Sequence, residues 1–276
     1  ARVSGALKRA GDYRGGLEFD KRALELRKLL LVAEPGNRAF RRAVAASYTT
    51  LGGSLFQVGD WAGVLATRRS ALKLHEELAA DPQADGDDYR SLNLAETRMA
   101  SIYSRNGDQA AAARMYERSL QTARKGLEKF PRHVQLRLGL AAGLSGLARV
   151  QLAEKNYSGA VANYTTAHEL YQEIAAEDPQ DTRSRSMLAT SHYRRGRAYT
   201  ILGDAGRAAK ELQIALKMRE QLAEADPVNA GAQGEVAEAQ AALGDAAARL
   251  NQRGAALEWY RRAHAILQKL QQELQD

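Results

Sequence analysis

The tripeptide Gly59-Asp60-Trp61 occupies a position that recurs through the chain at a constant spacing of 48 residues. The equivalent tripeptides are Gly11-Asp12-Tyr13, Gly107-Asp108-Gln109, Lys155-Asn156-Tyr157, Gly203-Asp204-Ala205 and Asn251-Gln252-Arg253. Each lies between two stretches with the apolar spacing of a helix, and its middle residue is in all but the last case a helix-capping type. A fixed period of this size is typical of solenoids, in which similar units stack on one another. The period therefore predicts an all-α repeat array.

All five prolines of the chain lie in a second kind of turn, which alternates with the first. They are Pro35, Pro82, Pro131, Pro179 and Pro227. Proline cannot continue a helix interior, because it lacks the N–H group and clashes with the preceding turn. Capping residues follow these prolines at Asn37, Asp85, Asp181 and Asn229, whereas His133 is a poor match for a cap. We therefore predict one array over residues 1–276, with a half repeat at 1–36 and full repeats at 37–82, 83–130, 131–178, 179–226 and 227–276.

Small residues recur where the first helix of a repeat (helix A) must approach the second (helix B). The helix-A column is Gly52, Ala100, Ala148, Gly196 and Gly244. The helix-B column is Gly16, Val64, Ala112, Ala160, Ala208 and Ala256. A column of larger residues is expected in the core, and it consists of Tyr116, Tyr164, Leu212 and Tyr260. Trp61 is expected to cover its turn against the neighbouring repeat.

These columns, together with the Gly-Asp-aromatic turn, resemble the tetratricopeptide repeat. Residues Gly203-Asp204-Ala205-Gly206-Arg207-Ala208-Ala209 are similar to the inter-helix turn of that family. The resemblance covers almost the whole chain, although the usual unit of the family has about 34 residues. It implies a right-handed superhelical solenoid of antiparallel helix pairs that binds proteins in a concave groove. The lengthened unit resembles repeats found beside bacterial Ser/Thr kinase domains, which implies a regulatory or sensor segment of a larger bacterial signalling protein.

The charge pattern bears on the class of partner. The net charge is +7, but Lys and Arg alternate with Asp and Glu instead of forming a polybasic run. Aromatic residues do not interleave with a basic stripe, so nucleic acid is not the expected partner. No apolar stretch approaches the roughly 20 residues that span a bilayer. We therefore expect a cytoplasmic chain without a membrane span and, because it begins within a repeat, part of a longer protein.

Residues with catalytic chemistry form no known constellation in the sequence. There is no cysteine, and none of the five histidines forms a His-x-x-x-His pair. A phosphate-binding glycine loop and the kinase catalytic signatures are also absent from these residues. We therefore predict that the chain is not an enzyme, and that it has no metal site, no cofactor and no small-molecule substrate.

The face of helix A that does not carry the small column is the predicted lining of the groove. In the first two full repeats this face consists of Arg42, Ala46, Thr49, Thr50, Gly53 and Phe56, then Arg90, Leu94, Thr97, Arg98, Ser101 and Ser104. The predicted binding residues of the middle repeats are Arg98, Arg149, Tyr193, Arg194 and Arg197. Guanidinium groups donate paired hydrogen bonds to carboxylates, so we predict an acidic peptide or protein segment as the partner. The alternative is that these arginines pair with neighbouring acids and remain solvated.

A structural self-association module is the second functional hypothesis. Stacked repeats need polar outer faces at their ends to remain soluble. The C-terminal stretch of residues 268–276 is polar enough to serve as such a cap. The N-terminal end has no equivalent cap, so a homodimer through that end is possible.

Overall fold

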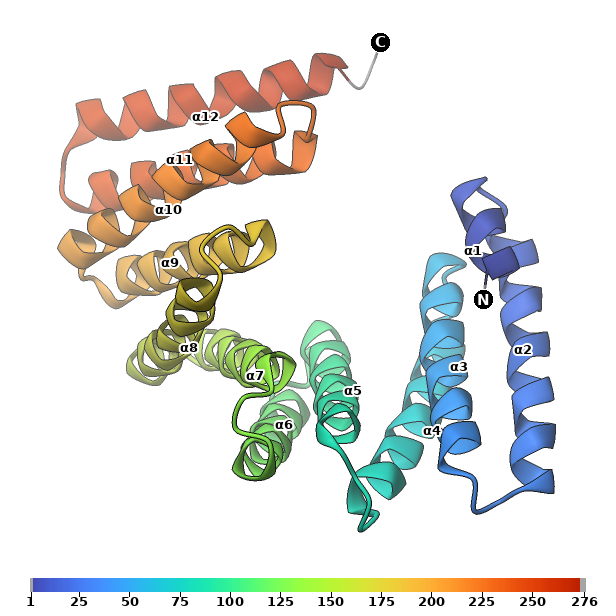
Figure 1. Ribbon diagram of the computed structural model, residues 1–276. Coiled ribbons are helices and arrows are strands. Elements are labelled where there is room, and N and C mark those ends of the chain that lie inside the picture. Colours follow the sequence, from blue (N-terminus) through green and yellow to red (C-terminus); the bar gives the residue numbers. More distant parts are fainter. Residues whose placement is uncertain (1, 274–276) are drawn as a thin grey trace. The chain divides into compact units, whose positions relative to one another are not determined.

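The computed structural model describes residues 2–273, and within that range the chain forms twelve α-helices and no strand (Figure 1). The helices are α1 (Arg2–Arg9), α2 (Tyr13–Ala33), α3 (Arg38–Gln57), α4 (Trp61–Ala80), α5 (Gly86–Arg105), α6 (Gln109–Lys129), α7 (Val134–Ala153), α8 (Tyr157–Glu177), α9 (Thr182–Leu202), α10 (Ala205–Ala225), α11 (Ala230–Arg249) and α12 (Arg253–Glu273). The predicted polar C-terminal cap extends to residues 274–276, which lie outside the described residues. The chain divides into two compact units, Ala1–Gly139 and Leu140–Asp276, and each is described by itself.

The short turn inside each repeat contains one residue with a left-handed backbone. At Gly59 φ is +79°, a region that glycine enters without a Cβ clash. The other glycines of the column that adopt it are Gly11, Gly107 and Gly203. Lys155 (φ 62°) and Asn251 (φ 60°) adopt the same conformation where the column lacks glycine. The turn geometry is therefore conserved along the chain even where the preferred residue is not present.

Asp60 both ends one helix and begins the next. Its amide donates to the carbonyl oxygen of Leu55 at 2.9 Å, which is the long hydrogen bond of a Schellman motif. Its carboxylate accepts from the amide of Gly63 at 2.8 Å and so caps α4. The two roles of this one residue explain why a Gly-Asp pair marks the turn.

The proline turns are capped as predicted, and one cap is stronger than the sequence suggested. The carboxylate of Asp85 accepts from the amide of Asp88 at 3.0 Å, and Asp88 accepts in return from Asp85 at 3.2 Å, which completes a capping box. At the turn that lacks a standard cap, Nδ1 of His133 accepts from the amide of Leu136 at 3.3 Å. The imidazole therefore takes the place of the missing carboxylate.

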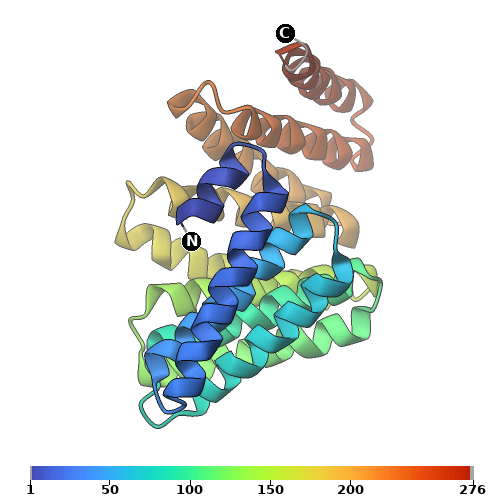
Figure 2. The same cartoon turned by 90° about the vertical axis from the view of Figure 1, so that its right-hand side faces the viewer.

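In the first unit, consecutive helices pack side by side from α1 to α6. Figures 1 and 2 show α2, α3 and α4 in this arrangement. Their shared core is apolar and consists of Leu17, Leu24, Val44, Leu51, Leu55 and Val64. A second core joins α4 to α5 and consists of Leu72, Ala79, Leu92, Ala95 and Met99. Gly52 of the small column is buried. A Cβ at this position would lie only 3.0 Å from the hydroxyl oxygen of Thr67, so the close packing of α3 and α4 favours glycine here.

In the second unit, α8 to α12 also pack each against the next (Figure 1). The core of α9 to α11 includes Leu212, which is fully buried. A Cβ at Gly196 would lie 2.7 Å from Cγ of Leu212, so the helix-A small column is what lets α9 and α10 approach. The column therefore has the packing role that its spacing predicts.

Two aromatic residues differ from the sequence-based expectation. Tyr260 is 39% exposed, whereas Tyr116 and Tyr164 of the same column are buried. Tyr260 lies on α12, the last described helix, and no later helix of the described chain packs over it. Trp61 is 56% exposed and does not seal its turn; its ring packs edge-on against Phe56 with 5.1 Å between centroids.

Candidate functional site

The five predicted binding residues are divided between the two units. Arg98 lies on α5 in the first unit and is partly buried. Arg149 on α7 and Arg197 on α9 are exposed, and both belong to the second unit, as do the partly buried Tyr193 and Arg194 of α9. Each unit therefore presents its own set of arginines.

In the second unit, α9 brings Tyr193 between two guanidinium groups. The guanidinium carbon of Arg197 lies 5.9 Å from the ring centroid, and that of Arg219 on α10 lies 4.2 Å away. These distances are within the range of cation–π attraction. Arg219 is nearly buried at 3% exposure and donates to the carbonyl oxygen of Glu235 at 2.7 Å. The sequence analysis did not single out Arg219, because it placed the predicted groove on the helix-A faces and Arg219 lies on helix B.

Arg197 also lines a cavity of about 570 Å³ in the second unit. The hydroxyl of Tyr260 donates to Oδ1 of Asp245 at 2.8 Å in this cavity. This hydrogen bond raises the pKa of Tyr260 and holds its ring at the cavity wall. The lining residues are Arg197, Thr200, Ile201, Ala242, Asp245, Ala248, Arg249 and Tyr260. Cations outnumber the single acid in the lining.

In the first unit, Arg98 and Arg68 of α4 both line two small cavities. One cavity, of about 140 Å³, is lined by Ala46, Thr49, Arg68, Ala71, His75, Ser91, Leu94, Ala95 and Arg98. The other, of about 170 Å³, is lined by Phe56, Trp61, Val64, Arg68, Arg98, Ser101, Ile102, Arg105 and Asn106. Several of these residues belong to the helix-A faces that the sequence analysis singled out. Arg68 was missed, since it lies on helix B.

Arg68 and Arg98 form an unusual electrostatic pair. Burial lowers the pKa of both guanidinium groups, and the positive charge of Arg98 lowers the pKa of Arg68 further. Within residues 2–273 neither group has an ion pair with an acidic side chain. Arginine nevertheless stays protonated in proteins, so two positive charges stand close together without a counter-ion. Such an arrangement costs free energy unless an anion is present.

His75 adds a neutral polar group to the smaller cavity. Its Nδ1 is buried and has no hydrogen-bond partner among the described residues. Burial lowers the pKa of His75, with the charge of Arg98 acting in the same direction and Asp88 against it. The imidazole is therefore neutral at pH 7 and available for one more hydrogen bond.

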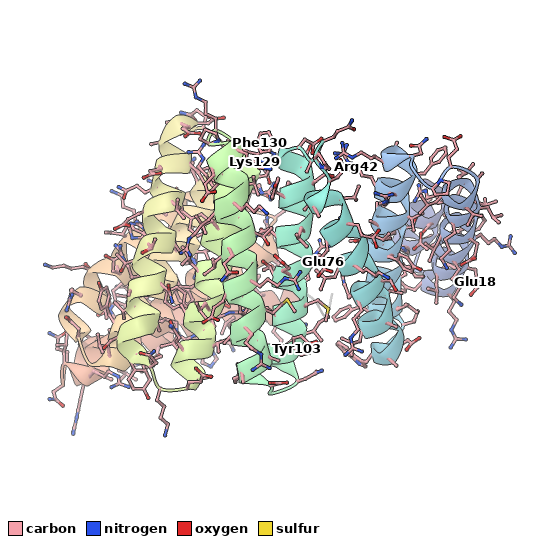
Figure 3. All side chains as sticks on the ribbon, turned by 90° about the horizontal axis from the view of Figure 1, so that it is seen from below. Glu18, Arg42, Glu76, Tyr103, Lys129 and Phe130 are labelled. Atoms are coloured by element: carbon pink, nitrogen blue, oxygen red, sulfur yellow. The ribbon has the colours of Figure 1, made fainter. Side chains whose placement is uncertain are left out.

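Other partly buried arginines of the first unit do have acidic partners. Asp88, at 2% exposure, accepts from Arg38 at 2.6 Å and from Nε of Arg42 at 2.8 Å (Arg42 is labelled in Figure 3). Arg118 of α6 reaches Glu76 of α4 at 2.5 Å. These pairs connect consecutive repeats, which is a structural role.

A second buried polar cluster connects α8, α9 and α10. Nδ1 of His168 lies 2.9 Å from the hydroxyl of Ser191, and His192 contacts Glu211 at 2.8 Å. Burial lowers the pKa of His168 to about 4, whereas hydrogen bonds from His192 and Arg195 outweigh burial and lower that of Glu211 to about 2. Ser191 and His168 are only 4% and 5% exposed, so a substrate in solvent does not reach this pair. The cluster is polar packing between helices.

Residues 2–273 contain neither a cluster of metal ligands nor a helix that could span a membrane. No group of three or more His, Cys, Asp or Glu side chains in that range is arranged to hold a metal ion. None of the described helices has the length and apolarity that crossing a membrane requires.

Comparison with known proteins identifies the repeat. Residues 97–134, which include Arg98, match the family model described as tetratricopeptide repeat. This stretch is similar to a tetratricopeptide repeat. No curated protein sequence matches the chain. The tetratricopeptide match covers the end of α5, all of α6 and the first residue of α7.

Solved structures show the same fold over most of the chain. The crystal structure of BtubC (BKLC) from P. vanneervenii is 19% identical and superposes with a TM-score of 0.73, covering 94% of this chain and 92% of that one. The apo form of RapI is 16% identical with a TM-score of 0.58, covering 82% of this chain and 70% of RapI. Identities this low establish the fold alone. The predicted all-α solenoid of tetratricopeptide-like helix pairs is thereby confirmed.

Proposed function

We propose that the chain is a protein–protein interaction scaffold that binds an acidic segment of a partner protein along its helix-A faces. One observation carries this proposal. Arg98, Arg194 and Arg197 have no ion pair with an acidic side chain of the described residues. Other partly buried helix-A arginines, Arg42 and Arg195, contact carboxylates at 2.6 Å and 2.5 Å. Among the helix-A arginines of the described residues, Arg98, Arg194 and Arg197 therefore keep binding capacity for a partner.

The alternative explanation for these arginines required neighbouring acids. According to that alternative, Arg194 and Arg197 would form ion pairs with neighbouring carboxylates, as Arg207 does with Asp204 at 2.5 Å. Instead, Arg197 lies over the ring of Tyr193. A guanidinium group held by an aromatic ring keeps its in-plane N–H donors free for a bidentate carboxylate.

The context of the scaffold is also a proposal. We propose that residues 1–276 form one array and act as the regulatory or sensor segment of a larger cytoplasmic signalling protein of bacteria, such as a Ser/Thr kinase. The lengthened 48-residue repeat supports this idea through its resemblance to repeats of that kind. The scaffold itself would need no cofactor, metal or small-molecule substrate.

The test is loss of binding in a double variant. Wild type and Arg194→Ala with Arg197→Ala are compared against an acidic peptide library at low and high salt. Lys210→Ala with Lys217→Ala is the matched control, because it removes two exposed charges from helix α10. We expect the first variant to lose salt-dependent binding and the control to keep it. Equal binding by both variants, or binding without salt dependence, would contradict the proposal.

Self-association remains a second candidate because of one apolar surface. Helix α2 exposes Phe19, Leu26 and Leu30 at 43%, 64% and 48%. Large apolar side chains exposed on one helix commonly mark an interaction surface. If two copies associate through α2, light scattering of the wild-type chain gives a dimer mass, and Leu26→Glu gives a monomer mass. A monomeric wild type at high concentration would eliminate this candidate.

A further inference from the structure

We propose that Arg68 and Arg98 form a recognition site in the first unit for an acidic side chain that is adjacent to an apolar side chain in the bound segment. This inference rests on the proposed function and names the chemistry of one of its sites. The two arginines come from α4 and α5, and both line the two small cavities described above. An acidic group between them would touch both guanidinium groups.

Arg68 reaches the two cavities across the backbone of α3. A Cβ built on Gly52 of α3 would lie 3.3 Å from Nε of Arg68, so the bare backbone of α3 leaves the room that the guanidinium stem occupies. Thr67, the preceding residue, turns its hydroxyl back to the carbonyl oxygen of Gly63 at 2.7 Å. The side chain of Arg68 therefore lies against α3, and it lines the same two cavities as Arg98 of α5.

The two arginines give the cavities an excess of positive charge. Arg68 and Arg98 repel each other and lack acidic partners in residues 2–273, while the solvent around them is partly excluded. A single carboxylate can accept hydrogen bonds from two guanidinium groups and cancels part of both charges. Nδ1 of His75, which is buried and unpartnered, lines the same cavity and supplies a further polar contact. Arg68, Arg98 and His75 could therefore all contact one anionic ligand in this cavity.

An apolar surface lies beside the two arginines and could contact the side chain next to the acid. The cavity of about 170 Å³ shares both arginines, but its other wall is formed by Phe56, Trp61 and Ile102. The rings of Phe56 and Trp61 are 43% and 56% exposed, which leaves apolar surface uncovered beside the charges. An aromatic or aliphatic side chain that follows or precedes the acid would cover that surface.

The local electrostatics favour a carboxylate over a phosphate group. Phosphate dianions are commonly bound at the N-terminus of a helix, where free amides point at the ligand. The N-terminus of α4 lies beside this cavity at Trp61, but Asp60 already caps it with a carboxylate. The carboxylate of Asp60 would repel a dianion more strongly than it repels a single negative charge, and a carboxylate still cancels part of the charge of the arginine pair.

The experiment is a peptide array probed with the whole chain. Each peptide carries two variable adjacent residues in a constant Gly/Ser frame, with phosphoserine included among the variable residues. We expect wild type to select Asp or Glu next to an aromatic or large aliphatic residue. Arg68→Gln with Arg98→Gln should lower binding to these peptides by at least about tenfold, the change expected for loss of one charged hydrogen bond.

Matched controls separate this site from the rest of the scaffold. Arg114→Gln with Arg124→Gln removes two exposed charges from α6 and should bind like wild type. Trp61→Ala should keep selection for the acid but lose selection for the apolar neighbour. Circular dichroism of each variant establishes that it is folded.

The outcomes are distinct. Unchanged selection in the Arg68/Arg98 variant, or a preference for phosphoserine, would overturn this site while leaving the scaffold proposal intact, provided that Arg194→Ala with Arg197→Ala still abolishes binding. Failure of wild type to bind any acidic peptide would overturn both. As a direct readout, Trp61 fluorescence in a Trp259→Phe background should change on titration with the selected peptide. If the fluorescence of Trp61 does not change at a saturating peptide concentration, the peptide does not bind beside Trp61 and the proposed site is wrong.

Discussion

Glu96 of α5 provides a quantitative test of how this array tolerates buried charge. Its side chain is 0% exposed, and neither carboxylate oxygen has a well-aligned hydrogen-bond partner among the described residues. Nε of Arg118 lies 2.7 Å from Oε1, but Arg118 is shared with Glu76 (labelled in Figure 3). Burial raises the pKa of Glu96 to about 7, and its neighbours offset only part of that effect. The carboxyl therefore changes its charge near neutral pH.

The sign and size of the effect follow from proton linkage. The folded state holds the proton more tightly than the unfolded state, because the pKa is about 7 when folded and 4.5 in the unfolded reference. The contribution to stability is fully present below pH 4.5 and is lost as the pH rises through 7. Between pH 5 and pH 8 the loss amounts to about 2.5 kcal/mol in the free energy of unfolding.

The assay is urea denaturation of wild type and Glu96→Gln at pH 5, 6.5 and 8. Trp61 fluorescence in a Trp259→Phe background reports the first unit, and the difference between the two proteins at each pH removes the titration of all other groups. We expect the stability of wild type relative to Glu96→Gln to fall by about 2.5 kcal/mol over this interval. Glu117→Gln on the exposed face of α6 should show no such trend.

Two results would refute this reasoning. A difference that does not vary with pH would mean that Glu96 does not titrate in this range. A difference that rises with pH would mean that the ion pair with Arg118 dominates over burial and depresses the pKa instead. Either result would show that the interior of the α4 to α6 region is more polar than its exposed fractions indicate.

Three other predictions follow from single contacts. Asp88→Asn leaves two arginines without their shared carboxylate and should lower the free energy of unfolding by about 3 kcal/mol, measured in urea. Gly196→Ala places a Cβ 2.7 Å from Cγ of Leu212 and should cost about 1–3 kcal/mol, whereas Gly234→Ala meets no atom within 4 Å and should be neutral or stabilising. Burial lowers the pKa of His168 from 6.5 to about 4, so wild type should lose about 3 kcal/mol relative to His168→Asn as the pH falls from 6.5 to 4 in the same assay.

The parts of the fold that the sequence predicted are those that depend on local chemistry. A left-handed turn residue followed by a capping carboxylate needs only neighbouring atoms, so Gly59 and Asp60 mark the turn wherever they recur. Close helix packing needs small residues at fixed spacing, and Gly196 meets that need against Leu212. Both signals repeat every 48 residues, which is why they stand out from the background of a single sequence.

The parts that were missed depend on what lies opposite a residue in space. Tyr260 shares a column with Tyr164, but it becomes exposed because no later helix of the described chain packs over α12. Arg68 lies on helix B, whereas the groove prediction considered the helix-A faces. Only the long side chain, passing over Gly52, brings its charge next to Arg98.

The distinction that we propose between structural and binding arginines rests on their partners more than on their exposure. Arg98 and Arg195 are both partly buried on a helix A, yet Arg195 contacts Glu211 at 2.5 Å while Arg98 has no acid within reach among the described residues. Replacing Arg195 would leave Glu211 buried with one partner fewer, so it should destabilise the fold. Replacing Arg98 removes a charge that nothing balances, so it should cost binding and leave stability equal or higher. An arginine such as Arg98, which the fold does not need for its stability, is therefore the better candidate for binding an anion.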